Sequence, residues 1–506
     1  IATDSLRSWK FDVCGCSFLA AIPNKLNTFH ADVSLEAKNR FCERAIPDST
    51  LFSDGSALLP YPIMRSRKLI AIAMAPFLLL PFFFSSAQES RESEVKVLAY
   101  INATIYPVSS PKIEKGTLLV KGDTILAVGT SEDVKIPVEA EVINAFGKTI
   151  IPGLICTHSH IGSVAGADSS SPIQPEVRVL DSIDVRNTSI NKARAGGITT
   201  ANLMSGSGHL LSGQTIYLKL RKGNIVDDLT IKLSDGSLAY GVKMANGTNS
   251  IRDSGPFPGT RGKSAALVRQ KFIDAQAYLK KREKHQEEKP EEAFERDLAL
   301  ETLADILEGK RTVHHHTHRH DDILTVLRLK EEFGFKVVLH HVSEAWKVAD
   351  EIAEADVPCS IIFLDSPGGK LEARDFEWKN GAELSKRGVV TAFHTDDPIN
   401  DSRWFLRNAA VGVRAGMSRQ KALEGLTLAG AKMLDLDDSI GSLDPGKQAD
   451  FVMLSGDPFS IYTRVLETHI EGEKVFDLEN PTDRLFAEGG YGAGHNREAS
   501  GCCFYR

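Results

Sequence analysis

Residues 149–160 read Thr149-Ile-Ile-Pro-Gly-Leu-Ile-Cys-Thr-His-Ser-His160 and contain the strongest structural signal in the chain. The apolar residues of this stretch predict a buried β-strand. The strand ends in His158 and His160, and side chains two residues apart on a strand project from the same face. Such a pair can chelate a metal ion, although two hydrogen-bonded histidines at a strand end fit the pattern equally well. The remaining sequence has to distinguish these alternatives.

Strand-like and helical segments alternate after this stretch. The strand-like runs are residues 198–204, 238–244, 312–316, 336–341, 360–363 and 389–394. The clearest helical segment is 263–281, where apolar residues recur at helical spacing. This alternation predicts an α/β fold with parallel strands and crossover helices, which we interpret as a (β/α)8, TIM-like barrel over residues 151–435.

Short strands with polar turns flank the predicted barrel on both sides. Residues 93–150 contain hairpin-like runs around the turn Lys121-Gly122-Asp123, and β-type sequence returns in residues 436–478. We predict that these two segments pair to form a small composite β-sandwich domain beside the barrel.

Residues 64–87 have the layout of a secretory signal peptide, with a basic start, an apolar run from Leu69 to Phe84 and small residues at 85–87. A membrane anchor is the alternative, but the run of about 16 residues contains two prolines and is short for a span. We therefore expect an exported protein, periplasmic or extracellular, without a stable membrane span after cleavage.

The two ends of the chain are not expected to belong to the folded domains. Residues 1–63 precede the signal-like segment and are interpreted as a non-native upstream extension, and the glycine-rich residues 482–506 as a disordered tail. The net charge of −7 argues neither for nor against a partner, but the sequence lacks the basic stripe that binding to nucleic acid requires. A homo-oligomer is compatible with the sequence.

Polar side chains recur at the ends of the later strand-like runs. In a barrel of parallel strands these ends converge on one face, where active sites are found. The segments supply Lys243, the cluster His314-His-His-Thr-His318, His341, Asp396 and Asp397. Strand alternation puts His314, His316 and His318 on one face and does not choose among them.

Three other side chains have both a functional and a structural interpretation. Lys243 is either an ion-paired lysine or, beside a metal, a carbamate formed with CO2. Arg178 either meets a substrate carboxylate or forms a structural salt bridge. His209 either contacts substrate or stabilises a loop.

The order His-x-His, Lys, His, His, Asp resembles the metal-dependent amidohydrolase superfamily. Residues 151–160 are similar to its first-strand signature, Ala195-Gly-Gly-Ile-Thr-Thr200 to its second-strand entry, and residues 441–452 to its C-terminal β signature. The resemblance extends from about residue 95 to 477. Within the superfamily, the chain is most similar to the imidazolonepropionase-like and Xaa-Pro or Xaa-Arg dipeptidase-like branch.

The resemblance implies a site with one or two zinc ions. His158 and His160 would hold the first metal, His316 and His341 the second, and the carbamate of Lys243 would bridge them. Asp396 would be both a metal ligand and the acid/base residue. His314 or His318 could replace His316, and Arg178, His209 and His318 are the candidates for contact with substrate.

The function implied by the resemblance is hydrolysis of a C–N bond in a small amide, dipeptide or cyclic amide by metal-activated hydroxide. Two alternatives remain open from the sequence. One is a metalloenzyme of the same fold that hydrolyses lactones or esters or isomerises its substrate. The other is an exported binding protein without catalytic activity.

Overall fold

The computed structural model describes residues 12–13, 16–17, 95–363 and 370–489. The chain divides into two compact units, residues 1–89 and 90–506. In the first unit, β1 (Asp12–Val13) pairs antiparallel with β2 (Cys16–Ser17). The signal peptide expected at 64–87 lies outside the described residues, as does most of the expected extension 1–63.

Parallel strands form the centre of the second unit. They are β8 (Leu154–Ser159), β9 (Ile198–Leu203), β12 (Val242–Ala245), β13 (Val313–Thr317), β14 (Val337–His341), β15 (Cys359–Ile361) and β16 (Thr391–Phe393). Every residue of these strands is buried, which explains why they read as short apolar runs rather than as alternating ones. The fold is α/β and TIM-barrel-like, as predicted.

The parallel strands belong to two sheets rather than to one closed eight-stranded barrel. One sheet has the order β10-β12-β13-β14-β15-β16 and the other β11-β9-β8. The regular repeat is interrupted because β10 (Leu211–Gln214) and β11 (Ile216–Lys219) run antiparallel to β12 and β9. The expectation of eight regular βα units is therefore corrected for this part of the chain.

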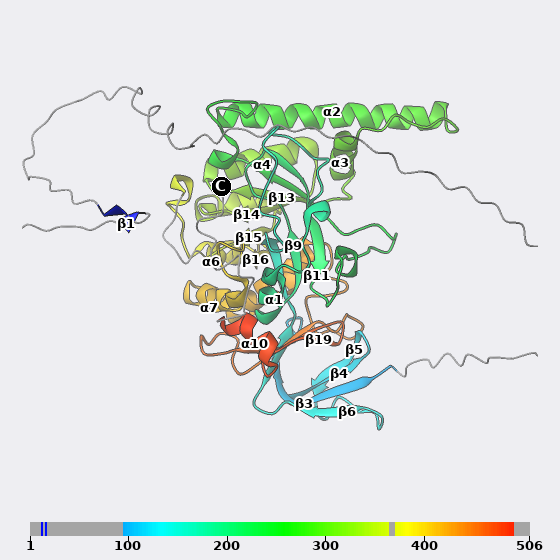
Figure 1. Cartoon of the computed structure of the whole chain (residues 1–506), viewed down its shortest axis with the longest axis vertical. Helices are drawn as coiled ribbons and strands as arrows, with labels where there is room; N and C mark the ends of the chain where they lie inside the picture. Colours follow the sequence, from blue (N-terminus) through cyan, green and yellow to red (C-terminus); the bar gives the residue numbers. More distant parts are fainter. Residues whose placement is uncertain (1–11, 14–15, 18–94, 364–369, 490–506) are drawn as a thin grey trace, which may run out of the picture. The chain divides into compact units, whose positions relative to one another are not determined.

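Helices cover the outside of these strands. They are α1 (Thr188–Ala195), α2 (Arg261–Glu288), α3 (Leu298–Leu307), α4 (His320–Phe333), α5 (Ala349–Glu354), α6 (Asn380–Lys386), α7 (Arg407–Arg414), α8 (Arg419–Leu426) and α9 (Leu428–Met433). The long helix α2 is attached through Phe272, whose ring stacks on Phe333 and Phe335 with centroids 5.1 Å away in both cases. Its far end carries mostly charged residues and extends from the body of the unit (Figure 1).

Strands from the two flanking segments share one sheet. Its order is β19 (Glu473–Asp477), β18 (Val465–Ile470), β17 (Phe451–Leu454), β7 (Thr149–Pro152), β3 (Val97–Ile105), β4 (Ile113–Lys121) and β5 (Thr124–Thr130), and β6 (Glu141–Asn144) pairs with β3. The predicted sandwich is thus a single sheet by its hydrogen bonding. Its division from the barrel as a separate domain stays a prediction, because residues 90–506 form one compact unit.

A buried ion pair connects this sheet to the barrel strands. Lys219 at the end of β11 contacts Asp450 just before β17, with Nζ and Oδ2 2.6 Å apart and both side chains at most 3% exposed. Buried charges are tolerated only when they are paired and hydrogen-bonded, so the pair constrains the two elements to this contact.

The structure bears on the expected disordered tail and on the expected lack of a membrane span. Residues 481–488, expected to begin a disordered tail at 482, form helix α10 (Pro481–Glu488), capped by the Asn480 side chain. Residues 490–506 lie outside the described residues. Among the helices that the structure describes, none has the length and apolarity that a membrane crossing needs.

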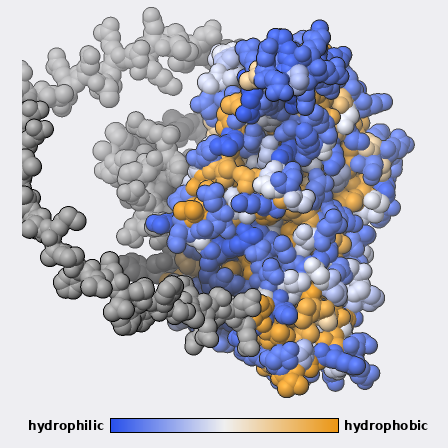
Figure 2. Space-filling view, turned by 90° about the vertical axis from the view of Figure 1, so that its right-hand side faces the viewer, coloured by the Kyte–Doolittle hydropathy of each residue, from blue (hydrophilic) through white to orange (hydrophobic). Residues whose placement is uncertain are grey.

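The face in Figure 2 is mostly hydrophilic, with several apolar areas, one of them at the lower end of the view. The exposed large hydrophobic residues around β6 include Val138, Val142 and Phe146.

Candidate metal centre and active site

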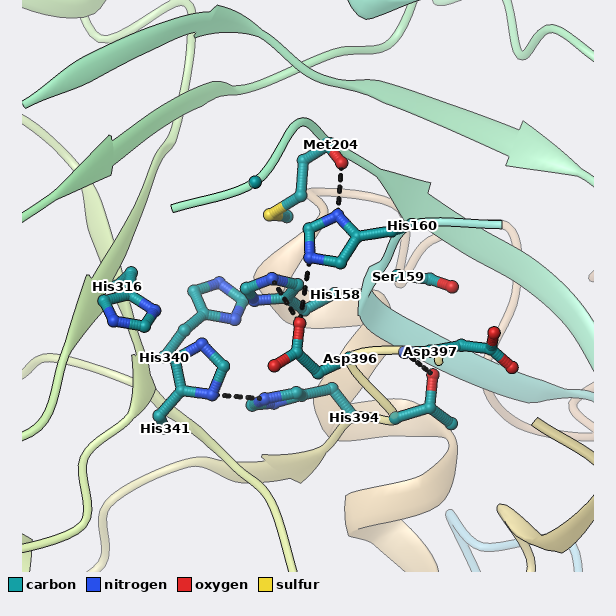
Figure 3. Close-up of polar contacts among 12 residues, drawn as sticks. His158, Ser159, His160, Met204, His316, His340, His341, His394, Asp396 and Asp397 are labelled. Carbon is teal, nitrogen blue, oxygen red and sulfur yellow. Dashed lines mark hydrogen bonds and ion pairs between the residues drawn. The ribbon is translucent and has the colours of Figure 1, made fainter. Parts of the chain in front are cut away.

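His158, His160 and Asp396 converge on one point at the end of β8. The Oδ1 atom of Asp396 lies 2.9 Å from Nε2 of His160 and 3.3 Å from Nε2 of His158 (Figure 3). The His158 side chain is fully buried, whereas that of Asp396 is 17% exposed. The group of His158, His160 and Asp396 is therefore accessible to solvent at the Asp396 carboxylate.

Backbone hydrogen bonds between the end of β8 and the segment after β16 create this convergence. The Asp396 amide donates to the carbonyl oxygen of His158 (3.0 Å), and the His160 amide donates to that of Asp397 (3.2 Å). Asp396 has a φ of 52°, in the left-handed region, where aspartate is better tolerated than most residues. Such backbone conformations cluster at functional sites.

The orientation of the His160 ring determines which of its nitrogens can bind a ligand. Its Nδ1 lies 2.6 Å from the carbonyl oxygen of Met204, which can only accept a hydrogen bond. Nδ1 therefore carries a proton, and in the neutral form of the ring the lone pair is on Nε2, which faces Asp396. Metal-binding histidines generally have this arrangement, with the second nitrogen donating to a carbonyl or carboxylate.

Lys243 is fully buried beside this group. Its Nζ lies 3.2 Å from Nε2 of His158 and 3.1 Å from Sδ of Met204. Burial lowers the pKa of Lys243 to about 7, against the opposing charge of Asp396. The lysine is thus placed at the cluster, as the sequence predicts; its carbamylation stays a prediction.

A second set of imidazoles lies next to the first. His316, at the end of β13, and His341, at the end of β14, have ring centroids 4.4 Å apart, and His341 is 4.8 Å from His158. His341 has a φ of 70°, so the backbone turns sharply where the strand ends. All six residues predicted as ligands, namely His158, His160, Lys243, His316, His341 and Asp396, therefore belong to one cluster.

His394 was not among the predicted site residues, yet it lies in the cluster. Its ring stacks on His158 with centroids 5.0 Å apart, and its Nε2 is 3.1 Å from Nδ1 of His341. The Oγ of Ser360 contacts its other nitrogen at 2.7 Å. The sequence signal was the spacing of His394 and Asp396, which repeats that of His158 and His160.

His340 also contacts the cluster, with its ring centroid 5.0 Å from that of His158. Its Nε2 is 3.0 Å from Nδ1 of His314, and Nε2 of His314 is 2.8 Å from the hydroxyl of Tyr217. His314, one of the alternative ligands from strand five, is thus occupied on both ring nitrogens. The candidates for the metal ligand from this strand are therefore His316 and His318.

The three residues proposed to contact substrate lie in different surroundings. Arg178 forms a bidentate ion pair with Asp181, at 2.7 and 2.9 Å, which is the structural alternative that the sequence left open. His209 is buried and packs on Phe257 with centroids 5.3 Å apart. His318 lies in the cluster, 4.7 Å from His316 between centroids.

The donor set of the cluster fits a divalent metal ion. Burial lowers the pKa of the clustered histidines, to about 3 for His318 and His394, so their rings are neutral and have a lone pair to offer. Burial acts to raise the pKa of Asp396, but its contact with His160 and the neighbouring charges together outweigh burial and lower that pKa. Within the cluster, five buried ring nitrogens have no hydrogen-bond partner among the described residues: His158 Nδ1, His316 Nδ1, His318 Nε2, His340 Nδ1 and His341 Nε2.

Three groups of side chains have ligand atoms within 4.8 Å of one another: His158, His160 and Asp396; His158, His341 and His394; and His316, His318 and Glu372. Neutral imidazoles combined with carboxylate oxygens are the ligands typical of zinc. The geometry therefore defines an α/β enzyme with a candidate metal centre at the carboxyl ends of its strands.

Comparisons with known proteins agree with this class. The amidohydrolase family profile matches residues 347–476. An amidohydrolase structure from Thermotoga maritima MSB8 is 34% identical, with a TM-score of 0.69 over 75% of this chain and 100% of that one. The chain belongs to the amidohydrolase family and is a hydrolase.

Two curated relatives are more distant. Amidohydrolase tasK of Hapsidospora irregularis is 25% identical over 72% of this chain, and the match spans 40% of the length of that protein. An imidazolonepropionase of Alkaliphilus metalliredigens is 23% identical over 68% of this chain and 84% of its own length. Both support the predicted imidazolonepropionase-like branch of the family.

Proposed function

We propose that this chain is a metal-dependent amidohydrolase that hydrolyses a C–N bond of a small amide, dipeptide or cyclic amide. The observation that carries the proposal is the convergence of Asp396 Oδ1 with Nε2 of His158 and of His160. Relatives named amidohydrolase and imidazolonepropionase support the substrate class.

His158, His160 and Asp396 would hold the metal, and zinc is the ion that their donor set favours. When bound, such an ion supplies a water activated near neutral pH and polarises the substrate carbonyl. His160 is fixed for this task, because its Nδ1 proton is committed to Met204 and its Nε2 stays available.

Asp396 is the group that moves the proton. Its carboxylate is the exposed member of the set and is ionised at neutral pH, so it can accept a proton from the attacking water and deliver it to the leaving nitrogen. The surrounding imidazoles and Lys243 exclude bulk water, which strengthens electrostatic interactions within the site.

Asp396→Asn tests this role because it keeps the shape of the side chain and removes the proton acceptor. We expect turnover of the best substrate in a panel of dipeptides, N-acyl amino acids and cyclic amides to fall by about 10²–10⁴-fold. Asp401→Asn is the control, since Asp401 lies in the same loop but pairs with Arg403. Full activity of Asp396→Asn would refute the assignment, and wild-type activity on lactones alone would refute the C–N substrate class.

The signal-like residues 64–87 support the further proposal that the enzyme is exported to the periplasm or beyond. Fractionation of bacterial cells that express the chain from Met64 tests it, with Leu69–Phe84 interrupted by charged residues as the control. Recovery of the uncleaved protein in the cytoplasm would contradict export.

A further inference from the structure

His394 is a buried side chain to which the proposed function assigns no task. It follows β16, and its amide donates to the carbonyl oxygen of Ile361 at 3.1 Å, next to Ser360 on β15. The ring stacks on that of His158 with an interplanar angle of 19°, and the residue is fully buried. The backbone contact and the stacked ring therefore limit the directions in which its two nitrogens can point.

Both nitrogens of His394 contact a polar atom of the barrel interior. Nδ1 lies 2.7 Å from Oγ of Ser360, and Nε2 lies 3.1 Å from Nδ1 of His341. Oγ of Ser360 in turn lies 2.6 Å from Oγ1 of Thr157 on β8. These side chains form a continuous chain of hydrogen bonds from β8 through β15 to the end of β14. While the chain is intact, neither nitrogen of His394 is available to a metal ion.

The direction of this chain decides which nitrogen of His341 carries a proton. Each contact needs one donor, and a neutral imidazole has only one N–H. If His341 donates from Nδ1, then His394 donates to Ser360, and Nε2 of His341 has a lone pair. If the hydroxyl of Ser360 donates instead, His394 donates to His341, and Nε2 of His341 carries the proton. The two directions therefore correspond to the two tautomers of His341.

The surroundings of Nε2 of His341 favour the first direction. This nitrogen is buried and has no hydrogen-bond partner among the described residues. The ring lies 4.4 Å from that of His316 and 4.8 Å from that of His158 between centroids, so it lies within the candidate metal centre. A proton on Nε2 would make it a buried donor without an acceptor, whereas a lone pair there can bind a cation.

We propose that His394 and Ser360 are positioning residues, which hold the proton of His341 on Nδ1 and leave Nε2 unprotonated at the metal centre. His394 connects a hydroxyl to an imidazole and does not itself bind the metal. The inference rests on the proposed function, because the lone pair of His341 matters to the reaction only when a metal ion is bound. The resemblance implies that His341 is a ligand, but it assigns no task to His394 or Ser360.

The tautomer of His341 in the full-length apoprotein tests the inference without any turnover. Long-range proton–nitrogen NMR spectra of protein with isotope-labelled histidine distinguish a protonated from an unprotonated ring nitrogen, and the signals missing in His341→Ala identify His341. We expect the proton on Nδ1 in the wild type. In His394→Phe, which keeps a ring but removes both nitrogens, we expect a mixture of the two tautomers. A wild-type proton on Nε2, or an unchanged tautomer in His394→Phe, would overturn the inference.

Zinc affinity, measured by competition with a chelator, gives a second readout. His341→Ala identifies the zinc equivalent that depends on His341. His394→Phe should weaken that equivalent by about 10–100-fold, the usual loss when the outer partner of a metal-binding histidine is removed. His394→Gln should recover much of the loss, because its side-chain oxygen can accept the Nδ1 proton of His341. Ser360→Ala should weaken the same equivalent by about 2–10-fold.

A double-mutant cycle separates a connected chain from two independent structural contacts. In a connected chain Ser360 acts only through His394, so Ser360→Ala should cause no further loss in the His394→Phe background, and additive losses would overturn the inference. Ser264→Ala is the matched control, because Ser264 is also buried but its hydroxyl donates to the Thr260 carbonyl at the start of α2; it should bind zinc as the wild type does. Should His394→Phe fail to fold by circular dichroism, Ser360→Ala decides, and a wild-type tautomer and affinity in that variant would overturn the inference.

His158→Ala separates this inference from the proposed function. If His158→Ala loses zinc while His341→Ala and His394→Phe bind it as the wild type does, the proposed metal centre stands and the inference fails. If the wild type binds no zinc, the proposed function fails, and the tautomer of His341 in the wild type and in His394→Phe alone decides the inference.

Discussion

Nε2 of His160 lies 2.9 Å from Oδ1 of Asp396, and this contact is the reason for expecting a bound cation in the cluster. The Nδ1 proton of the ring is committed to the Met204 carbonyl, so in the neutral form of the ring Nε2 and Oδ1 of Asp396 are both acceptors. Two acceptors at this distance repel each other unless a proton or a metal ion lies between them. A metal ion satisfies both atoms and His158 together.

His469, which lies outside this cluster, belongs to a contrasting arrangement in which protein groups alone satisfy a carboxylate. Glu467 in β18 contacts Nε2 of His469 at 2.8 Å and Nζ of Lys474 at 3.2 Å. Burial raises the pKa of Glu467, but the hydrogen bond from His469 and the charge of Lys474 outweigh burial and lower that pKa to about 2.

This lowered pKa predicts a pH-dependent contribution to stability. The ionised form of Glu467 is favoured in the folded state, so its contribution is complete above the ordinary pKa of 4.5 and is lost as the pH falls toward 2. Glu467→Gln should lower the free energy of unfolding by about 1–2 kcal/mol at pH 7, after allowance for partial exposure.

Urea unfolding of the wild type and Glu467→Gln at pH 7, 4 and 3 measures this effect. The difference between the two proteins should shrink at the two lower pH values. Glu473→Gln is the control, since the Glu473 side chain is 63% exposed, and it should change stability by less than about 0.5 kcal/mol. A difference for Glu467→Gln that does not depend on pH would mean that packing, not charge, is responsible.

At the scale of elements, strands with apolar runs could be predicted closely from the sequence. The run predicted at 198–204 is β9, and the run at 336–341 is β14, each within one residue. The antiparallel strands β10 and β11 were missed. The stretch 205–214, which contains β10, is rich in glycine and serine and lacks strand periodicity, and β11 is only four residues long. Their pairing with β12 and β9 depends on contacts distant in sequence.

The same reasoning explains what was found and missed in the site. Ligands at the ends of parallel strands, such as His158 and His341, are predictable because topology brings those ends together. Glu372 follows no strand directly, and only the Thr248 and Arg261 contacts place it beside His316. No spacing in the sequence indicates that position.

At the scale of the whole molecule, the eight-stranded sheet and the barrel strands are joined through β7, β8 and β17. β7 leads directly into β8 and pairs with β17, so the eight-stranded sheet holds the strand that carries His158 and His160. The buried pair of Lys219 and Asp450 adds a second connection between that sheet and the barrel strands. Ligands held on such packed elements keep their geometry before a metal binds.

The most direct test of the account is the zinc content of His158→Ala compared with the wild type, after both have been stripped with a chelator and reconstituted. His320→Ala is the control, because His320 pairs with Glu344 outside the cluster. The account predicts that His158→Ala loses one equivalent of zinc while His320→Ala loses none. A His158→Ala protein that is folded and retains the full wild-type content would contradict the metal centre described here.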